Sequence, residues 1–408
     1  MNKLSSIAYY VTEKISSIVI SLSEYVTTDC ILQNKKGREV ASNLPPQPCC
    51  LTRYQRGDIL IANIRPYLKK VWFADIDGGA SSDVLVFRAK EGHSPSFLYA
   101  VLLQDSFFDY VMQGAKGSKM PRGDKEQILR YEMPILSCSE ESIGTFFLNL
   151  DQKIRLNEQI NQNLEAMAKQ LYDYWFVQFD FPNEEGKPYK SSGGEMLWNE
   201  KLKRKIPVGW HCGNLFEIAV FTNGLACQKF RPKDNEVPLP VIKIREMHDG
   251  ISVDTEKVTS NIPESVKVYN GDVLFSWSAS LEVMLWAYGL GGLNQHIFKV
   301  TSANDFPKSF YYFQLLDYVD VFKKMAEARK TTMGHITQDH LQQSPIALPD
   351  NKDIADKFEE LISPIFRQII KLQEEISNLT KQRDELLPLL MNGQVAVNTD
   401  LAETGFIL

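Results

Sequence analysis

The sequence predicts an α+β fold in which two similar α/β modules are separated by two long antiparallel helices that form a coiled coil. Three observations support this prediction. The same order of strand-like and helix-like segments occurs twice, each copy is followed by a long amphipathic pattern, and the chain is too long for one ordinary domain. With 408 residues and 44% hydrophobic residues, each copy can bury its own core.

The repeat is clearest where a Gly-Asp turn leads into an apolar strand-like run. The first copy reads GDILIANIRP from Gly57, and the second reads GDVLFSWSAS from Gly271. The segments SSDVLVF and NQHIFKV then correspond, as do SPSFLYAVLLQ and PKSFYYFQLLD. Phe97 thus matches Phe310, an offset of 310 minus 97, or 213, and the same offset relates Met120 to Met333. We therefore expect both modules to share one topology, with Asp58 and Asp272 serving as turn residues.

Each module is followed by a helix with one apolar stripe. In the first helix the stripe positions are Leu156, Ile160, Leu164, Met167 and Leu171. In the second they are Ile365, Ile369, Leu372, Ile376, Leu379 and Leu386, with Arg383 at the same seam. We assign both stripes to the helical spacer and to contacts with partners; the alternative is that each packs only on its own module. Pro364 is expected to mark the start of the second helix or a kink.

Connectivity predicts the direction of the helices. If the first helix leads away from one module and ends at the other, the second helix can pair with it only by running back. Two similar modules on an antiparallel pair would be related by an approximate two-fold axis, as in a homodimer bound to duplex DNA. Such a molecule is suited to a split target whose halves lie roughly 34 Å apart, one turn of the double helix.

Composition narrows the class of protein. The N-terminal segment has no signal-peptide pattern and no uncharged apolar run reaches eighteen residues, so we expect a cytoplasmic protein without membrane spans. Six scattered cysteines without a CxxC pair indicate reduced thiols. The net charge of −6 means that any binding to nucleic acid depends on local basic clusters or on partners.

The arrangement is similar to the specificity subunit of type I restriction-modification systems over about residues 10–395. The segment that begins LNEQINQNLEAMAKQLYDYWFVQFDFP resembles the central conserved region of that family, and RDELLPLLMNGQV resembles its distal conserved region. Further matches in the second module are TNGLACQKFRP, LPVIKIREMHDG, LNQHIFKV, TTMGHIT and IALP. Each phrase is weak by itself, but their shared order is specific.

The resemblance implies five segments: target-recognition domains at 1–139 and 199–350, a central helical spacer and linker at 140–198, a distal helix at 351–395 and a tail at 396–408. It also implies a non-catalytic subunit that reads a bipartite DNA target. The implied partners are double-stranded DNA, two adenine methyltransferase subunits and restriction subunits, with a nucleoid-associated location in a bacterial or archaeal cytoplasm. S-adenosylmethionine would belong to the methyltransferase, and ATP and Mg to the restriction subunit.

Sequence motifs for catalysis are missing from this chain. It contains no GxxxxGK[ST] loop, no NPPY-like tetrapeptide, no HExxH and no GxSxG. We therefore expect no cofactor, metal or catalytic residue in this chain. Two other functions remain open: a coiled-coil adaptor whose modules bind protein or glycan, and an enzyme with an unrecognised active site.

Candidate DNA contacts in the first module lie in two segments. The loop AKGSKMPRGDK follows a helix that Ser94 and Pro95 should start, and it precedes a short helix that Asp124 should cap. Glycines let backbone amides approach phosphate, while lysine and arginine bind phosphate or guanine. The candidates are Lys116, Ser118, Lys119 and Arg122 in this loop, and Asn63, Arg65, Tyr67 and Lys69 in NIRPYLKK, which could instead be an exposed strand edge.

The second module offers a comparable set. Asn and Gln pair well with adenine and Arg with guanine, so TNGLACQKFRP and VIKIRE supply candidates of both kinds. The loop EARKTTMGHIT occupies the position of the basic loop in the first module. The candidates are Asn223, Gln228, Lys229, Arg231, Lys243 and Arg245, with Arg329, Lys330, Thr331, Thr332 and His335 in the loop. Trp277 and Trp286 are interpreted as core residues, and the aromatic segment YDYWFVQFDF is expected to fix the end of the first helix to a globular surface.

Overall fold

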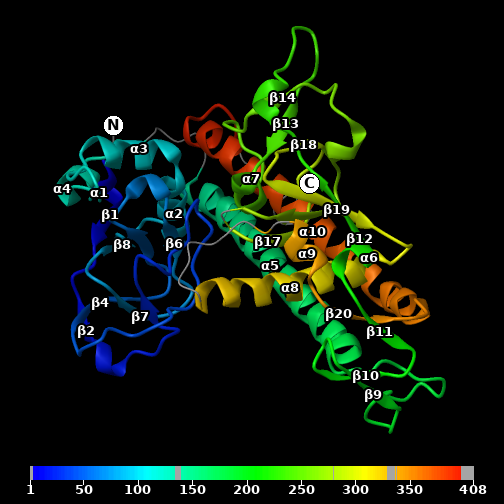
Figure 1. Ribbon diagram of the computed structural model, residues 1–408. Coiled ribbons are helices and arrows are strands. Elements are labelled where there is room, and N and C mark those ends of the chain that lie inside the picture. Colours follow the sequence, from blue (N-terminus) through cyan, green and yellow to red (C-terminus); the bar gives the residue numbers. More distant parts are fainter. Residues whose placement is uncertain (1–2, 134–138, 279, 329–335, 337, 397–408) are drawn as a thin grey trace. The chain divides into compact units, whose positions relative to one another are not determined.

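A computed structural model describes residues 3–133, 139–278, 280–328, 336 and 338–396 (Figure 1). The chain forms two compact units. Unit 1 consists of Met1–Leu156 together with Asn378–Leu408, and unit 2 consists of Asn157–Ser377. The division falls inside both long helices, α5 (Glu140–Tyr172) and α10 (Asp353–Met391), so each helix belongs partly to each unit.

Unit 1 contains two four-stranded sheets. The first is antiparallel and has the order β1 (Ala8–Tyr10), β8 (Val84–Ala89), β5 (Ile59–Ala62), β6 (Val71–Phe73). The second has the order β2 (Lys14–Ser16), β4 (Cys50–Tyr54), β7 (Gly78–Ala80), β3 (Tyr25–Val26), and β3 is parallel to β7. The helices are α1 (Leu4–Ile7), α2 (Pro95–Leu103), α3 (Asp105–Gln113) and α4 (Lys125–Ile128). Helix α2 packs on the first sheet, which Figure 1 shows in blue and cyan.

Unit 2 also contains two four-stranded sheets. The first has the order β12 (Ala219–Asn223), β19 (Ile297–Ser302), β16 (Val273–Ser276), β17 (Glu282–Leu285). The second has the order β14 (Lys257–Val258), β13 (Leu239–Ile242), β18 (Gly291–Leu293), β15 (Lys267–Val268). Two strand pairs lie outside these sheets: β9 (Met196–Asn199) with β10 (Arg204–Pro207), and β11 (Trp210–Gly213) with β20 (Ile346–Pro349). The remaining helices are α6 (Leu215–Ile218), α7 (Ile244–Asp249), α8 (Lys308–Ala328) and α9 (Gln338–Gln342).

The two units repeat one topology, as predicted. The antiparallel sheets correspond strand for strand: β1-β8-β5-β6 matches β12-β19-β16-β17. In the second sheets three strands correspond, because β7 and β18 each lie between one antiparallel and one parallel neighbour. The fourth strand differs: β2 pairs with the antiparallel neighbour in unit 1, whereas β14 pairs with the parallel neighbour in unit 2.

The Gly-Asp turns have the structural role predicted for them. Gly57 and Gly271 adopt φ of +89° and +88°, a conformation that L side chains rarely adopt. The carboxylate of Asp58 accepts a hydrogen bond from the Gln55 amide and pairs with Arg88. Asp272 repeats this arrangement with the Tyr269 amide and Lys299. Both aspartates therefore close a turn and hold the strand that follows it.

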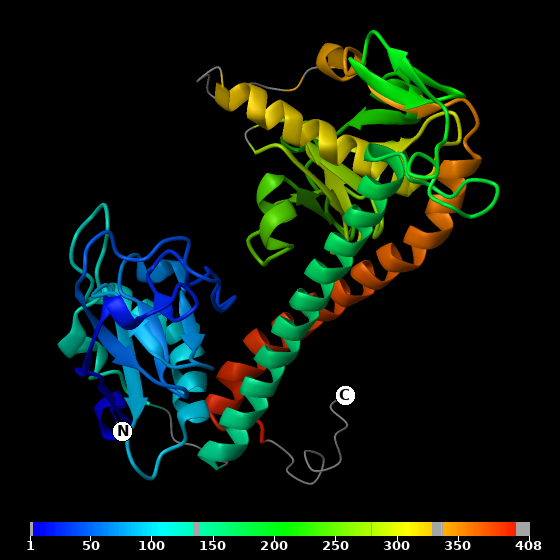
Figure 2. The same cartoon turned by 90° about the horizontal axis from the view of Figure 1, so that it is seen from below.

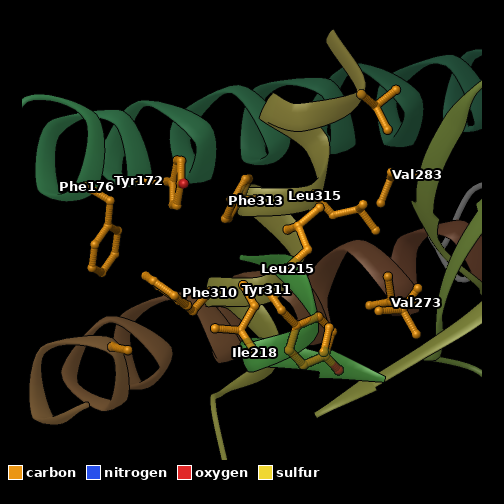
Figure 3. Close-up of a cluster of buried hydrophobic side chains, with 14 of the residues drawn as sticks. Tyr172, Phe176, Leu215, Ile218, Val273, Val283, Phe310, Tyr311, Phe313 and Leu315 are labelled. Carbon is orange, nitrogen blue, oxygen red and sulfur yellow. The ribbon is translucent and has the colours of Figure 1, made fainter. Parts of the chain in front are cut away.

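The core of unit 2 is rich in aromatic side chains from distant parts of the chain. Figure 3 shows Tyr172 and Phe176, at the end of α5 and in the following π-helical turn (Asp173–Val177), close to Phe310 and Phe313 of α8. The ring centroids of Tyr172 and Phe313 are 5.1 Å apart, and those of Phe176 and Phe310 are 4.9 Å apart. The prediction that this aromatic segment fixes the end of the helix to a globular surface is confirmed.

Helices α5 and α10 pack on each other in both units (Figure 2). In unit 1 the guanidinium of Arg383 lies 3.4 Å from the carboxylate of Asp151. In unit 2 the ring of Phe358 lies 6.1 Å from that of Tyr172. Because later positions of α5 contact earlier positions of α10, the two helices run antiparallel, as the connectivity argument required.

The seam of α5 differs from the predicted stripe. Leu156, Ile160 and Met167 are exposed, with fractions of 52%, 36% and 44%. The side chains that face inward are one position away, at alternating spacings of 4 and 3: Ile143, Phe147, Leu150, Ile154, Asn157 and Asn161. On α10 the stripe lies where it was expected, with Ile369, Leu372, Ile376 and Arg383 buried and Leu379 and Leu386 half-buried. Leu164 and Leu171 of α5 are half-buried against the unit 2 core.

Pro364 does not start the second helix. Helix α10 begins at Asp353, and Pro364 lies in its interior. The first turn is instead preceded by Asn351, whose side-chain oxygen accepts a hydrogen bond from the Asp353 amide at 3.0 Å. The alternative, a kink at Pro364, stays a prediction, since a proline in a helix interior removes one amide donor.

Candidate nucleic-acid interface

The two candidate segments of the first module form one surface. The Arg65 amide donates to the Pro121 carbonyl at 2.8 Å, and the Gly123 amide donates to the Asn63 carbonyl at 3.3 Å. The side-chain amide of Asn63 also donates to the Gly123 carbonyl at 3.3 Å. Residues 63–70 and 116–125 were proposed separately from the sequence, and the fold brings them together at the edge of the first sheet.

The basic loop is a closed hairpin. Lys116 and Arg122 exchange two main-chain hydrogen bonds of 2.9 Å each, so residues 117–121 form its tip. The expected caps on either side are present, because Ser94 accepts from the Phe97 amide and Asp124 accepts from the amides of α4. Beside the hairpin is an open hollow of about 540 Å³, lined by Lys116, Arg122, Gly123, Asp124, Lys125 and Glu126.

Carboxylates of the same module hold several of the candidate cations. The Lys116 ammonium lies 3.0 Å from Asp124, the Arg122 guanidinium 3.2 Å from Asp83, and the Lys69 ammonium 2.9 Å from Asp105. The hydrogen bond from Lys116 and those from the α4 amides hold the pKa of Asp124 below its usual value. Lys116 and Arg122 are exposed yet oriented, and Lys69 is half-buried; the two exposed cations suit contact with an anionic ligand that can replace the carboxylate.

The other candidates of the first module are exposed or half-buried. Arg65 and Lys69 flank the 3-10 turn Pro66–Leu68, and both adopt a left-handed backbone conformation, with φ of 54° and 51°. Tyr67, between them, is 50% exposed. Ser118 and Lys119 are exposed at the hairpin tip. Asn63 differs from these, because the residue is 9% exposed and its side chain bonds to the loop at the Gly123 carbonyl.

In the second module the described candidates lie along the end of β12 and the segment after it. Asn223, Gln228, Lys229 and Arg231 are all exposed. Lys243 pairs with Glu256 at 2.5 Å, and this contact lowers the pKa of Glu256. Arg245 pairs with the buried carboxylate of Glu246 at 2.7 Å. This module therefore also combines exposed amides with cations held by its own carboxylates.

The second basic loop falls largely outside the described residues. Arg329, Lys330, Thr331, Thr332 and His335 belong to that stretch, so their assignment stays a prediction. The residue after them supports the match between the loops. The Ile336 amide donates to the Trp277 carbonyl at 3.1 Å, as the Gly123 amide donates to Asn63 in the first module. Trp277 is half-buried against the core, and Trp286 is fully buried.

Sequence reasoning missed the residues that orient these side chains. Asp83 holds Arg122, and its counterpart in the second module is His296, whose ring lies 5.6 Å from that of Trp277. Charge patterning cannot identify Asp83, because isolated acids are common on protein surfaces. The repeat could have found it, since SSDVLVF aligned with NQHIFKV places Asp83 opposite His296.

The cysteines and the helices add two further observations. Cys30, Cys49, Cys50, Cys212 and Cys227 are free thiols, and Cys138 lies outside the described residues. No helix within the described part of the chain is both long and apolar enough to cross a membrane.

Comparison with known proteins finds similarity to one family. Residues 207–381 match the model of the type I restriction modification DNA specificity domain. The chain is 24% identical to the type I restriction enzyme MjaIX specificity subunit of Methanocaldococcus jannaschii, over 86% of this chain and 80% of that protein. It is 22% identical to the HindI specificity subunit of Haemophilus influenzae, over 91% of this chain and 94% of that protein.

A solved structure has the same fold. The S subunit of the type I restriction-modification system of M. genitalium superposes with a TM-score of 0.59 at 14% identity. The match covers 97% of this chain and 96% of the other. The expected fold class, which combines mixed modules with long helices, is therefore confirmed over nearly the whole chain.

Proposed function

We propose that this chain is a specificity subunit of the type I restriction-modification family and that it reads a bipartite DNA sequence, with one half-site for each module; its similarity to specificity subunits of that family supports this. The observation that carries the proposal is the duplicated module, in which sheets of the same topology carry matching bonds from the Gly123 amide to Asn63 and from the Ile336 amide to Trp277. In the first copy the basic loop is a hairpin braced by main-chain hydrogen bonds. One chain with two such surfaces can contact two stretches of one duplex.

The candidate side chains suit DNA in two ways. Exposed lysines such as Lys119 can neutralise phosphates, which positions a protein without reading sequence. Oriented arginines and amides, such as Arg122 and Asn223, can form paired hydrogen bonds with base edges in the major groove. Both kinds of group are present in the first module and among the described residues of the second.

We propose further that the long helices bind two adenine methyltransferase subunits, and that restriction subunits join the complex through them. The exposed residues Ile160 and Met167 of α5, together with Leu156, are apolar side chains on a helix that already has a packed seam. A second apolar face on such a helix is suited to another helix. In this proposal the chain itself is non-catalytic, and S-adenosylmethionine, ATP and Mg are bound by the partners.

Sequencing of methyladenine in host DNA, with and without this gene, tests the main proposal. We expect a methylated motif made of two short sequences around a fixed gap, and we expect it to disappear when the gene is removed. The triple charge reversal K116E/K119E/R122E should lower methylation at this motif or alter one half-site. A methylation pattern that is the same with and without the gene would contradict the proposal and favour an adaptor that binds protein or glycan.

A further inference from the structure

Two main-chain hydrogen bonds at the base of the recognition loop are the same in both modules. In unit 1 the Asn63 amide donates to the Asp83 carbonyl at 2.8 Å, and the Gly123 amide donates to the Asn63 carbonyl at 3.3 Å. In unit 2 the Trp277 amide donates to the His296 carbonyl at 3.3 Å, and the Ile336 amide donates to the Trp277 carbonyl at 3.1 Å. We call these two bonds the loop frame.

The side chains on this frame differ between the modules. Asn63 corresponds to Trp277, and Asp83 corresponds to His296. In unit 1 the Asp83 carboxylate holds Arg122, whereas in unit 2 the rings of His296 and Trp277 lie together and Trp277 donates to the Asn223 side chain at 3.2 Å. The two bonds of the frame use only backbone atoms, and in unit 1 the Asn63 side chain adds a further bond to the Gly123 carbonyl at 3.3 Å. Different chemistry at matched places is what two modules need in order to read different half-sites.

Arg122 is held more firmly than an ordinary surface arginine. Its own amide and carbonyl bond to Lys116 at 2.9 Å, and its neighbours Pro121 and Gly123 bond to Arg65 and Asn63. An added Cβ at Gly123 would lie 2.8 Å from the Asn63 side-chain oxygen, so the hairpin fits closely at this point. The backbone that carries the guanidinium is therefore fixed on both sides.

Asp83 then fixes the side chain. Its carboxylate lies 3.2 Å from the Arg122 guanidinium, with the two side chains 37% and 57% exposed. An ion pair this exposed adds little to stability, and a carboxylate on a DNA-binding surface repels phosphate. Its place beside Arg122 is explained if it limits the directions in which the guanidinium can point. An oriented guanidinium is suited to the paired acceptors O6 and N7 of guanine.

We propose that Arg122 reads a guanine in the half-site of the first module, and that Asp83 is the positioning residue that aims it. This inference rests on the proposed function. By contrast, Lys119 lies at the exposed tip of the hairpin and contacts phosphate, so it contributes affinity without sequence preference. His296, at the place of Asp83, contributes to the choice of the other half-site.

The test is methyladenine sequencing of host DNA from cells that carry the full-length chain and its native methyltransferase partner. The variants are D83A, R122A and the double variant D83A/R122A. Both single variants should relax the same G·C position of one half-site, with a loss of discrimination of about tenfold, and should leave the other half-site unchanged. The double variant should behave like R122A alone, because Asp83 acts only through Arg122.

Two variants serve as controls. Glu126 lines the same hollow but pairs with Arg130, so E126Q should leave the motif unchanged. K119A should lower methylation evenly at all sites without changing the motif. If D83A lowers the melting temperature, D83H, which introduces the residue of the second module, repeats the test with a polar side chain at that position.

The inference is overturned if D83A and D83H retain the wild-type motif while R122A relaxes it, or if all three lower methylation evenly. It is also overturned if Asp83 and Arg122 variants alter different positions. If the proposed function itself is wrong, the result is different: the wild-type chain would then produce no bipartite methylated motif that depends on this gene.

Discussion

Arg383 of α10 is a charged residue in an apolar seam, and its contacts explain why it is tolerated there. Its side chain is 4% exposed and contacts Asp151 and Asp384. Asp151 in turn accepts from the Tyr99 hydroxyl at 2.9 Å and pairs with Arg155. Burial disfavours the charge, but the two aspartates outweigh burial and raise the pKa of Arg383. The network joins α2, α5 and α10 within unit 1.

Replacing Arg383 by methionine should therefore destabilise unit 1. The R383M variant leaves the Asp151 carboxylate buried with less compensation, a change that costs about 3–5 kcal/mol when one partner of a buried pair is removed. Urea denaturation of the full chain measures the loss. R367M is the matched control, since Arg367 is exposed on the same helix and should change stability by less than about 0.5 kcal/mol. Equal midpoints for the two variants would contradict the role of the network.

Gly78 and Gly291 occupy matching places in β7 and β18, but the space around them differs. A Cβ at Gly78 would lie 2.1 Å from the Glu24 carbonyl oxygen, which is backbone and cannot move easily. A Cβ at Gly291 would first meet the flexible end of Ile242 at 2.7 Å. G78A should thus cost about 3 kcal/mol and G291A about 1 kcal/mol, measured by thermal unfolding. A larger loss in G291A would show that the close approach in β18 is the stricter one.

At the residue scale, sequence reasoning identified chemical types better than contacts. The turn role of Asp58 and the caps at Ser94 and Asp124 follow from local rules, because each bonds within a few residues of itself. The contact between Asp83 and Arg122 joins two residues that are 39 positions apart in the sequence (122 minus 83). It depends on how the hairpin closes. No local rule predicts such a pair.

At the scale of elements, α5 shows how a helical stripe can be misassigned. Its seam includes Asn157 and Asn161, which are 1% and 6% exposed. Hydrophobic periodicity passes over two buried amides and selects Leu156, Ile160 and Met167, which are exposed. On α10 the seam is apolar except for Arg383, and the pattern there identifies the buried side chains. The prediction failed where the protein places polar groups in a helix contact.

The buried amides should reduce stability. Asn157 Nδ2 and Asn161 Oδ1 have no hydrogen-bond partner among the described residues. N157L should therefore stabilise the chain by about 1 kcal/mol, because it removes an unpaired buried donor and adds apolar contact. Urea denaturation measures the change, and Q162L, on the exposed side of α5, is the control. A destabilised N157L would indicate that the amide is satisfied by an ordered water molecule.

The exposed apolar residues of α5 should serve assembly more than folding. The double variant I160E/M167E should keep the melting temperature of the free chain, since both side chains are already in contact with water. It should reduce copurification of the methyltransferase partner at least tenfold, because charged groups cannot be buried against another helix. Q162E adds charge elsewhere on the same helix and should copurify normally. Normal assembly of the double variant would place the partner on another surface.

At the scale of the whole molecule, the topology of the sheets follows from the repeat, whereas the net charge does not. The net charge is −6, and acids next to the candidate DNA-contacting residues compensate several of the cations there. Topology, by contrast, was predictable, because segments repeated in the same order at a nearly constant offset predict duplicated sheets. The different positions of β2 and β14 in their sheets were not predictable, since each is a short strand outside the repeated segments.

This charge balance predicts weak DNA binding by the free chain. A cation that already pairs with a carboxylate releases fewer counterions when it contacts phosphate, so the affinity should depend only weakly on salt. Fluorescence anisotropy with a labelled duplex between 50 and 200 mM salt should show a change well below the roughly 10³-fold typical of six phosphate contacts. Addition of the methyltransferase should tighten binding. A steep salt dependence of the free chain would show that the carboxylates release their cations at little cost.

The loop frame has one more consequence. Its bonds join peptide groups, so the side chains at positions 83 and 296 can be exchanged without removing a bond of the frame. Related proteins could then change the DNA half-site that they prefer by a few substitutions while they keep the same fold. On the proposed function, sequence differences among related chains should accumulate at these two positions sooner than in the sheets beneath them.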